Sequence, residues 1–400
     1  MRIVFMCDFI APKGGAARVG VDLVQLLAAQ SIPVKVLAGE PYEGGLADDI
    51  SVVSLNQQKL LLTDPRIGVF RGLFNTAAHA AVTKLIDQTD TPDTVYIINS
   101  WSQILSPSIF AALRRVSRRV LVYAHDYFLA CPNGGYFDFG HGEPCERAPL
   151  SLSCFATQCD KRNYMQKIWR TGMGAMRRLN WNVDLNGSRI IVVHEGMVKY
   201  LARGGIAEQS ISVVRNPSKP FTAVPVKAEH NREILYVGTL TTEKGVDVLV
   251  DALRERPWTL NMFGEGEIRF PPAPNIIAHG FQSHETIGRA AERSRLLIMP
   301  SRVRETFGLS ALEALGAGVP VVISSQAQVA ADIRTHQCGV VLPAVDKASI
   351  LKAVDDLYAD DGRTGELSRR ASRAHAMISP SFDEWTAQIL RICQSMLKSH

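Results

Sequence analysis

The apolar positions of this chain form short, nearly continuous runs that alternate with longer stretches of helical periodicity. Continuous apolar runs are typical of strands that are covered on both faces, as in parallel sheets. The first series of runs is 2–6, 34–37, 51–55, 94–99, 119–123, 189–194 and 211–215, and the second is 233–237, 259–263, 275–279, 296–299, 320–323 and 339–342. Helical stretches such as 19–29, 246–254 and 287–292 lie between the runs. This alternation predicts an α/β chain of two tandem, doubly wound, Rossmann-like domains, with the cleft between them as the expected ligand site.

A change of composition separates the two series. Residues 216–232 contain three prolines among polar residues, which indicates a linker. We therefore expect an N-terminal Rossmann-like domain over residues 1–216 and a C-terminal one over residues 217–379.

The last segment, 380–400, is expected to form a helix that returns to the N-terminal domain. Ser379 is the expected cap of this helix and Pro380 its first residue. The apolar residues expected to pack on the N-terminal domain are Trp385, Ile389 and Ile392.

Composition and charge narrow the class of protein. The chain has 400 residues, of which 46% are hydrophobic and 21% charged, as in a folded protein of two domains. No apolar run reaches the roughly 18 to 20 residues of a membrane-spanning helix, and the start resembles a first strand, not a signal peptide. The expected location is the cytoplasm. A net charge of +5 gives no reason to expect nucleic-acid binding but permits peripheral contact with the inner face of an anionic membrane.

The segment after the run 296–299 carries the most chemical content. It contains Gly308, followed from about Leu309 by a helical pattern rich in Ala and Leu. A helix that begins at the carboxyl edge of a sheet presents unpaired backbone N–H groups and the positive end of its dipole. We expect a diphosphate to bind the amides of Phe307, Gly308 and Leu309.

Two acids, Glu305 and Glu313, flank this anion site and stand eight residues apart. A carboxylate can accept two hydrogen bonds from a vicinal diol. Glu305 is therefore assigned to the hydroxyls of a sugar and Glu313 to those of a ribose. The alternative is an ordinary loop acid and a helix acid favoured by the dipole.

The run ETFGLSALEALGAGVPVV, which begins at Glu305, resembles the E-x7-E segment of the family-4 retaining glycosyltransferases. The preceding order is also similar: YVGTLTTEKG from Tyr236, FGEGE from Phe263 and HGFQS from His279. The resemblance implies a GT-B fold, with the acceptor on the N-terminal domain and the donor on the C-terminal domain.

The implied activity is transfer of a sugar, with retention, from a UDP- or GDP-sugar to a glycan or lipid-linked oligosaccharide in bacterial surface polysaccharide synthesis. The resemblance implies that no cofactor is required besides the nucleotide-sugar donor. A metal is not expected to be required, because Lys244 and the helix terminus supply positive charge and no Asp-x-Asp segment is present. A sugar-nucleotide epimerase of the same fold and a non-catalytic sugar-nucleotide-binding protein are the alternatives.

The resemblance also assigns roles to further donor-side residues. It places Lys244 on the leaving diphosphate, where the family often has a second basic residue at the position of Thr239. Gly14 and Gly15 would lie over the donor, although any tight strand-to-helix turn can need glycines. The other residues expected near the donor are Gly264, Glu265 and Phe281, the last beside the base.

His125 ends a strand and begins an H-D-x-x-x-x-C-P run found in some members of the family. We expect it to hydrogen-bond the transferred sugar or to stabilise charge at the anomeric carbon. The alternative is a structural histidine. The expected catalytic residues are therefore His125, Lys244 and Glu305.

Two further features lie after His125. Four of the seven cysteines cluster at Cys131, Cys145, Cys154 and Cys159, but their spacing lacks the close pairs of common zinc sites. Reduced cysteines or a redox-labile pair are favoured over zinc. The basic and aromatic segment 161–181 is interpreted as an amphipathic helix packed on its domain, with membrane contact as the alternative.

Overall fold

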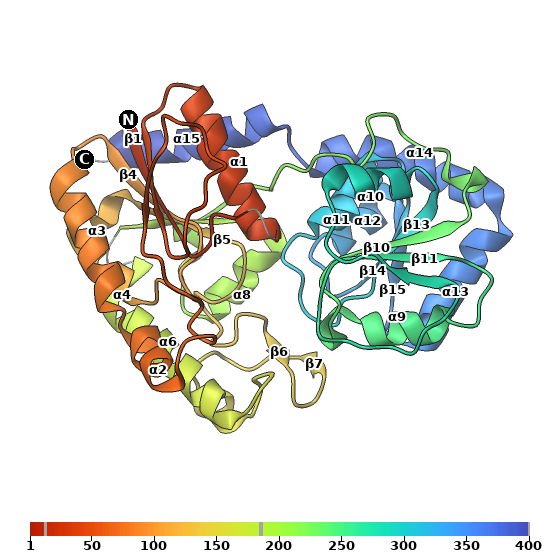
Figure 1. Ribbon diagram of the computed structural model, residues 1–400, viewed down its shortest axis with the longest axis horizontal. Coiled ribbons are helices and arrows are strands. Elements are labelled where there is room, and N and C mark those ends of the chain that lie inside the picture. Colours follow the sequence, from red (N-terminus) through yellow and green to blue (C-terminus); the bar gives the residue numbers. More distant parts are fainter. Residues whose placement is uncertain (12–13, 184–186, 399–400) are drawn as a thin grey trace. The chain divides into compact units, whose positions relative to one another are not determined.

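The computed structural model describes residues 1–11, 14–183 and 187–398. It divides into two compact units, each of which is described separately (Figure 1). Unit 1 comprises Met1–His141, Cys145–Val214 and Asp383–His400, and unit 2 comprises Gly142–Pro144 and Arg215–Phe382. Both units contain a parallel sheet between helices, which confirms the predicted α/β fold of two doubly wound domains.

Unit 1 is built on a seven-stranded sheet with the order β3-β2-β1-β4-β5-β8-β9, in which all pairings are parallel. The strands are β1 (Arg2–Cys7), β2 (Val34–Ala38), β3 (Ser51–Ser54), β4 (Thr94–Ile98), β5 (Val120–Ala124), β8 (Arg189–Val192) and β9 (Ile211–Val213). Every residue of β4 and β5 is buried, as expected from the continuous apolar runs. The strand order reverses between β1 and β4, and such a reversal is where parallel sheets bind ligands.

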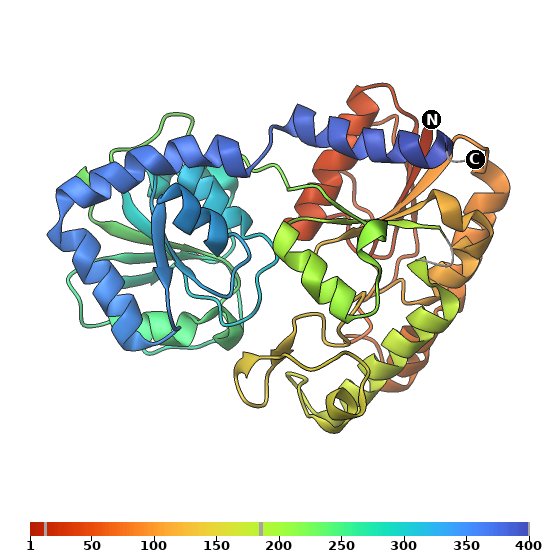
Figure 2. The same ribbon diagram turned by 180° about the vertical axis from the view of Figure 1, so that it is seen from behind.

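The helices of unit 1 cover both faces of this sheet. They are α1 (Gly15–Ala29), α2 (Pro65–Leu73), α3 (Thr76–Thr89), α4 (Ser108–Leu113), η1 (Arg114–Arg119), α5 (Leu152–Ala156), α6 (Tyr164–Asn180), η2 (Glu195–Met197), α8 (Val198–Arg203), η3 (Glu208–Ser210) and α15 (Phe382–Lys398). α1 lies on one face, and α3 and α4 lie on the other (Figure 1). α2 and α6 pack side by side (Figures 1 and 2). Two short strands, β6 (Phe137–Asp138) and β7 (Glu143–Pro144), precede α5.

The last helix, α15, packs within unit 1. The indole Nε1 of Trp385 donates a hydrogen bond of 2.8 Å to the hydroxyl of Tyr123 in β5, and both side chains are buried. Ile389 is also buried, whereas Ile392 is half-buried. Of the predicted segment 380–400, the final two residues lie outside the described part of the chain.

The predicted start of this helix is wrong. α15 begins at Phe382, and Ser379 is the C-cap of the preceding helix α14 (Asp361–Ile378). The hydroxyl of Ser379 donates to the carbonyl of Asn216 at 3.1 Å and accepts from Ser218 at 2.9 Å. Ser379 therefore ends α14 and forms hydrogen bonds with the linker, instead of capping α15.

Unit 2 contains a six-stranded parallel sheet with the order β12-β11-β10-β13-β14-β15. The strands are β10 (Glu233–Val237), β11 (Leu260–Phe263), β12 (Ile276–Ala278), β13 (Ser294–Met299), β14 (Val321–Ser324) and β15 (Gly339–Leu342). The other helices are η4 (Ala228–His230), η5 (Thr242–Lys244), α9 (Val246–Leu253), α10 (His284–Ala291), α11 (Leu309–Gly316), α12 (Ala330–His336) and α13 (Lys347–Ala359). The order reverses between β10 and β13.

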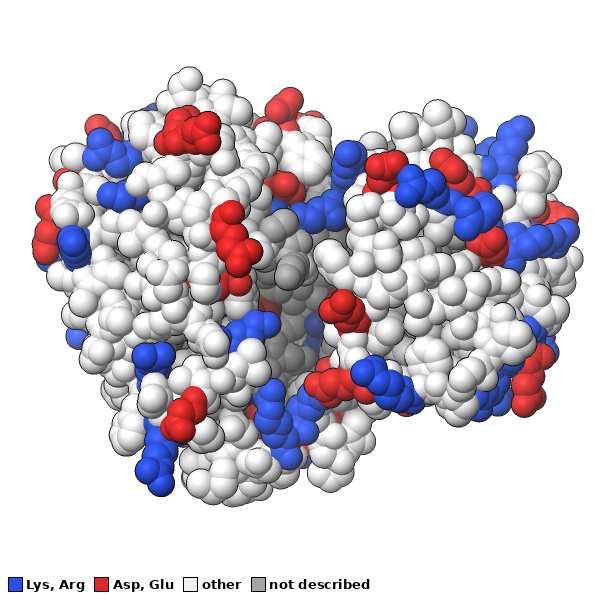
Figure 3. All heavy atoms as spheres, in the orientation of Figure 1, with Lys and Arg blue, Asp and Glu red and all other residues white. Residues whose placement is uncertain are grey.

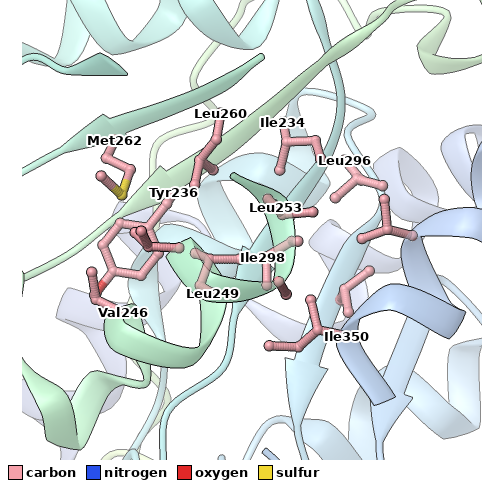
Figure 4. Packing of buried hydrophobic residues seen from close by; sticks show 14 of the residues in the cluster. Ile234, Tyr236, Val246, Leu249, Leu253, Leu260, Met262, Leu296, Ile298 and Ile350 are labelled. Atoms are coloured by element: carbon pink, nitrogen blue, oxygen red, sulfur yellow. The ribbon is translucent and has the colours of Figure 1, made fainter. Parts of the chain in front are cut away.

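The core between this sheet, α9 and α13 is apolar (Figure 4). Ile234 and Ile298 from the sheet face Leu249 of α9 and Ile350 of α13, and all four are fully buried. This packing fixes β10 and β13, whose carboxyl ends carry the residues discussed below.

The surface gives two further observations. No helix in the described ranges is both long and apolar enough to cross a membrane. On the face shown in Figure 3, basic side chains lie among acidic ones instead of gathering in one large area. This face has the mixed charge pattern of an ordinary solvated surface.

Arg295 in β13 provides a test of unit 2. Its buried guanidinium donates to the carbonyls of Leu357 and Glu229 and contacts Asp361. We expect Arg295→Met to remove the guanidinium hydrogen bonds to these carbonyls, which leaves the carbonyl of Leu357 with the Thr364 hydroxyl as its side-chain donor. The free energy of unfolding of unit 2 should fall by about 1–3 kcal/mol. Hydrogen exchange should show faster exchange of the slowest amides in α13. Arg289→Met, at an exposed arginine of the same unit, should leave that exchange unchanged, and equal exchange in both variants would contradict the prediction.

Candidate functional site

Lys244 and Glu305 meet at the reversal of strand order in unit 2. Lys244 ends η5 after β10, and Glu305 lies in the loop after the neighbouring strand β13. The Lys244 ammonium forms an ion pair with Oε1 of Glu305, and the Ser301 hydroxyl donates to the same oxygen at 2.7 Å. Burial by itself raises the pKa of the Glu305 carboxyl, but Lys244 and Ser301 outweigh it and hold that pKa below its ordinary value. Glu305 is therefore a carboxylate at neutral pH.

Backbone contacts hold these two loops together. The backbone N–H of Arg302 donates to the carbonyl of Glu243 at 2.9 Å, and its guanidinium binds the Asp247 carboxylate at 3.0 and 2.9 Å. The Glu305 carbonyl accepts the backbone N–H of Gln328 at 2.9 Å. These hydrogen bonds hold the loops of Lys244 and Glu305 in place, so the position of the ion pair does not depend on the attraction between the two charges alone.

The glycine after Lys244 allows this close approach. Gly245 has a φ of 74°, in the left-handed region, and a Cβ added there would lie 2.1 Å from the carbonyl oxygen of Pro300. Neither the backbone conformation nor the space admits a side chain. Gly245 therefore sets the distance between the loops that carry Lys244 and Glu305.

The predicted helix start next to Glu305 is confirmed, because α11 begins at Leu309. Gly308, with a φ of 88°, is its N-cap, and no side chain caps the first turn. Phe307 is buried. The positive end of α11 thus lies three residues after Glu305 and opens at the carboxyl edge of the sheet, although which amides bind a ligand stays a prediction.

Glu313 has a different partner from Glu305. It lies in the middle of α11 and is only 4% exposed, with Oε1 3.6 Å from Nε2 of His284 in α10. The His284 ring also contacts the ring of Phe221. His284 could not be predicted as a site residue, because its contact with Glu313 depends on how α10 packs beside α11.

The other donor-side residues predicted for unit 2 also follow the carboxyl ends of strands. Thr239 follows β10, Gly264 and Glu265 follow β11, and Phe281 follows β12 and is 59% exposed. A Cβ on Gly264 would lie 2.0 Å from the carbonyl oxygen of Gly238, so the loops after β10 and β11 touch. These residues therefore share one edge of the sheet with Lys244 and Glu305.

In unit 1, His125 lies at the corresponding edge. It follows β5, and its Nε2 is 2.7 Å from Oδ1 of Asn99, which follows β4. The Asn99 Nδ2 group donates to the carbonyl of Ala16 at 3.1 Å, so Oδ1 is the atom that faces the ring and Nε2 of His125 is the donor. Gly14 and Gly15 are exposed at the start of α1 and directly precede Ala16.

His125 is neutral at physiological pH. Its desolvation lowers the pKa of the ring well below the ordinary value. It can therefore donate or accept a hydrogen bond but does not supply a positive charge. Asn99 was not predicted as a site residue, although a polar residue directly after a buried strand was a readable signal.

Two carboxylates fix the loops around His125. Both oxygens of the buried Asp8, after β1, accept backbone N–H groups of residues 103–105 at 2.9 Å. Glu40 Oε1 accepts the N–H groups of Ile10 and Ala11 at 2.7 and 2.8 Å. Neither acid was predicted, because the acceptor role depends on loops brought together from distant parts of the chain.

The four clustered cysteines are free and buried, as are the other three. Among the residues that the structure describes, no group of three or more His, Cys, Asp or Glu side chains is arranged to hold a metal ion. The sulfurs have nitrogen neighbours: Lys167 for Cys154 and Cys159, and Arg147 for Cys145.

The C-terminal unit matches a known family. Residues 219–376 match the family described as Glycosyl transferases group 1. The glycogen synthase of Mycobacterium tuberculosis is 32% identical to this chain over 199 residues, which cover 45% of this chain and 46% of that protein. The alignments with the curated relatives span less than half of those proteins' lengths.

Solved structures resemble the whole chain. Sucrose-phosphate synthase (tll1590) from Thermosynechococcus elongatus has a TM-score of 0.73 at 14% identity and covers 100% of both chains. Anabaena Alr3699/HepE in complex with UDP has a TM-score of 0.67 at 15% identity, covering 99% of this chain and 100% of that one. These likenesses show that the fold is that of the GT-B glycosyltransferases.

The contact between Asn99 and His125 predicts a pH effect. In Asn99→Asp, a carboxylate replaces the amide beside Nε2 and stabilises the imidazolium, so the titration midpoint of His125 should rise by about 1 to 3 pH units. NMR titration of the His125 ring measures this midpoint. The matched control is Asn261→Asp in unit 2, where Asn261 Oδ1 lies 2.9 Å from His279 Nε2, and it should leave the His125 midpoint unchanged. An unchanged midpoint in Asn99→Asp would show that the two side chains do not interact in solution.

Proposed function

We propose that this protein is a retaining glycosyltransferase that moves a sugar from a UDP- or GDP-sugar to a glycan or lipid-linked oligosaccharide. The observation that carries the proposal is the Lys244–Glu305 ion pair beside the uncapped start of α11. A cation, a helix dipole and a carboxylate then lie together at the ligand-binding edge of a parallel sheet. This is the combination of charges that a diphosphate joined to a sugar requires.

In the proposal, the diphosphate binds the first turn of α11 and the Lys244 ammonium. As the bond between the anomeric carbon and the phosphate oxygen breaks, negative charge grows on the leaving diphosphate. A fixed ammonium and oriented amides stabilise that charge more than they stabilise the bound substrate, so they lower the barrier. No metal is required in this scheme, because the positive field comes from the chain itself.

Glu305 holds hydroxyls of the transferred sugar, and Glu313 holds those of the ribose. Because Lys244 keeps Glu305 ionised, the carboxylate is available as an acceptor at neutral pH. Neutral His125 hydrogen-bonds the sugar through its ring, oriented by Asn99. The acceptor hydroxyl attacks from the face that the diphosphate leaves, and the departing phosphate takes its proton, which retains the anomeric configuration.

The comparisons support this proposal over its alternatives. Residues 219–376 match a glycosyltransferase family, and the structure of Alr3699/HepE was solved in complex with UDP. An epimerase of the same fold would release or convert a nucleotide sugar without an acceptor, and a non-catalytic binder would turn over nothing. Release of nucleoside diphosphate that depends on added acceptor separates transfer from both.

The roles of Lys244 and Glu305 can be separated by measurement. Glu305→Gln should lower kcat for sugar transfer about 100-fold while nucleoside diphosphate binding by calorimetry changes little, because Glu305 contacts the sugar. Lys244→Met should weaken binding of UDP or GDP about tenfold or more, because it removes the diphosphate's cation. The matched controls are Glu285→Gln and Lys347→Met, at exposed positions of the same unit. Full transfer activity in Glu305→Gln would refute the assignment.

We also propose that a surface of unit 1 contacts an anionic membrane near a lipid-linked acceptor. Its apolar side chains lie on α2, on the loop before it and on α6. The most exposed are Leu62 at 71%, Phe70 at 74%, Met165 at 72% and Leu179 at 72%. Arg66 is exposed on α2, and Arg162 is exposed just before α6. Apolar side chains next to basic ones are typical of interfacial binding.

Vesicle sedimentation tests this surface. The double variant Leu62→Ser, Phe70→Ser should bind vesicles containing phosphatidylglycerol about tenfold more weakly than the unmodified chain, because it removes buried apolar area at the interface. The control pair Val224→Ser, Met377→Ser changes equally exposed residues of unit 2 and should bind normally. Equal binding by both double variants would exclude this surface as the contact.

A further inference from the structure

Lys167 is buried next to sulfur atoms. It lies on α6 and is 1% exposed. Its ammonium is 3.2 Å from Sγ of Cys154 in α5 and 3.1 Å from Sγ of Cys159 just beyond that helix. In the described part of the chain, no carboxylate lies within ion-pairing distance of this nitrogen, so the two thiols are the groups that face it.

This environment is unusual for a lysine. An ammonium removed from water is costly unless an anion or several acceptors face it. A thiol is a weak acceptor, but a thiolate is a full anion and also a nucleophile. The Lys167 charge therefore favours the thiolate form of whichever thiol ionises, and the Lys167 nitrogen is already within hydrogen-bond distance of both sulfurs.

We propose that Lys167, Cys154 and Cys159 form an oxidation site, in which hydrogen peroxide converts one thiol to a sulfenic acid and the Lys167 amine captures it as a sulfenamide. The thiolate sulfur attacks one peroxide oxygen, the O–O bond breaks, and hydroxide leaves. This hydroxide takes a proton from the Lys167 ammonium and becomes water. The free amine then attacks the sulfenic sulfur, an S–N bond forms, the S–O bond breaks, and a second water leaves.

The reaction balances as one thiol, one amine and one peroxide giving one sulfenamide and two waters. Sulfur is oxidised and the peroxide is reduced. The link would join α6 covalently to Cys154 in α5 or to Cys159 just after it, and a thiol reductant would restore the thiol and the amine. Asn133, whose amide donates to the carbonyl of Cys159 at 2.9 Å, holds the cysteine backbone in place.

The pH dependence follows from burial. Burial raises the pKa of the Cys159 thiol, the Lys167 charge opposes that rise only in part, and the neighbouring Cys154 and Cys145 thiols add to it. The thiolate is then a minor species at neutral pH. Formation of the link should accelerate as the pH increases from about 7 to 9, because the thiolate fraction grows.

Peptide mapping of the peroxide-treated full chain tests the proposal. Trypsin should release residues 148–161, which contain both cysteines, joined to residues 163–170, because a modified Lys167 blocks cleavage after it. The joined species should weigh two hydrogen atoms less than the sum of the two peptides. Peptides with the buried Cys338 and Cys393, which have no such lysine, should stay unmodified in the same digest.

Variants and metal content complete the experiment. Lys167→Met should abolish the joined species, whereas Lys161→Arg, at an exposed lysine of the same segment, should retain it. If Lys167→Met does not fold, the unmodified chain still decides the question. A disulfide within residues 148–161, peroxide-treated cysteines without a link to Lys167, or a zinc ion held by the freshly purified protein would each overturn the proposal.

Discussion

The ion pair between Lys244 and Glu305 is the interaction on which the account of unit 2 depends. It joins the loops after β10 and β13, the two neighbouring strands at which the sheet order reverses. The pair forms because Gly245 has no side chain, so the loop of Lys244 can approach the carbonyl of Pro300 closely. Arg302, in the loop of Glu305, also forms hydrogen bonds with Glu243 and Asp247. A charged pair held by backbone contacts keeps its geometry when a ligand arrives, so little reorganisation is needed.

Each unit places an asparagine beside a histidine, although only in unit 1 do both residues follow the carboxyl ends of strands. Asn99 faces His125 in unit 1, and Asn261 faces His279 in unit 2. The amide of Asn99 fixes the orientation of the His125 imidazole without adding charge, so this ring stays neutral when it is desolvated. In the proposed catalytic set, His125 is therefore a hydrogen-bonding group and not a second cation, which leaves Lys244 as the cationic member beside the Glu305 carboxylate.

The sequence was sufficient for the features that depend on local pattern. The apolar runs located the strands of both sheets, with β10 and β15 at the predicted bounds, and Gly308 marked the start of α11. The sequence was insufficient where one residue could belong to either of two helices, or where a contact joins residues that are far apart in the chain. Ser379 can cap either neighbouring helix, and the bond from its backbone N–H to the carbonyl of His375 shows that it ends α14. The Lys244–Glu305 contact, 61 residues apart in the chain, depends on strand order, which periodicity does not encode.

The central claim is that a diphosphate binds between Lys244 and the first turn of α11. A crystal structure with a bound UDP- or GDP-sugar analogue tests it most directly. The account predicts phosphate oxygens within about 3.5 Å of the Lys244 ammonium and of the backbone N–H groups at the start of α11, with the sugar hydroxyls on Glu305. A diphosphate bound at any other edge of the sheet, with the Lys244–Glu305 pair facing only solvent, would contradict it.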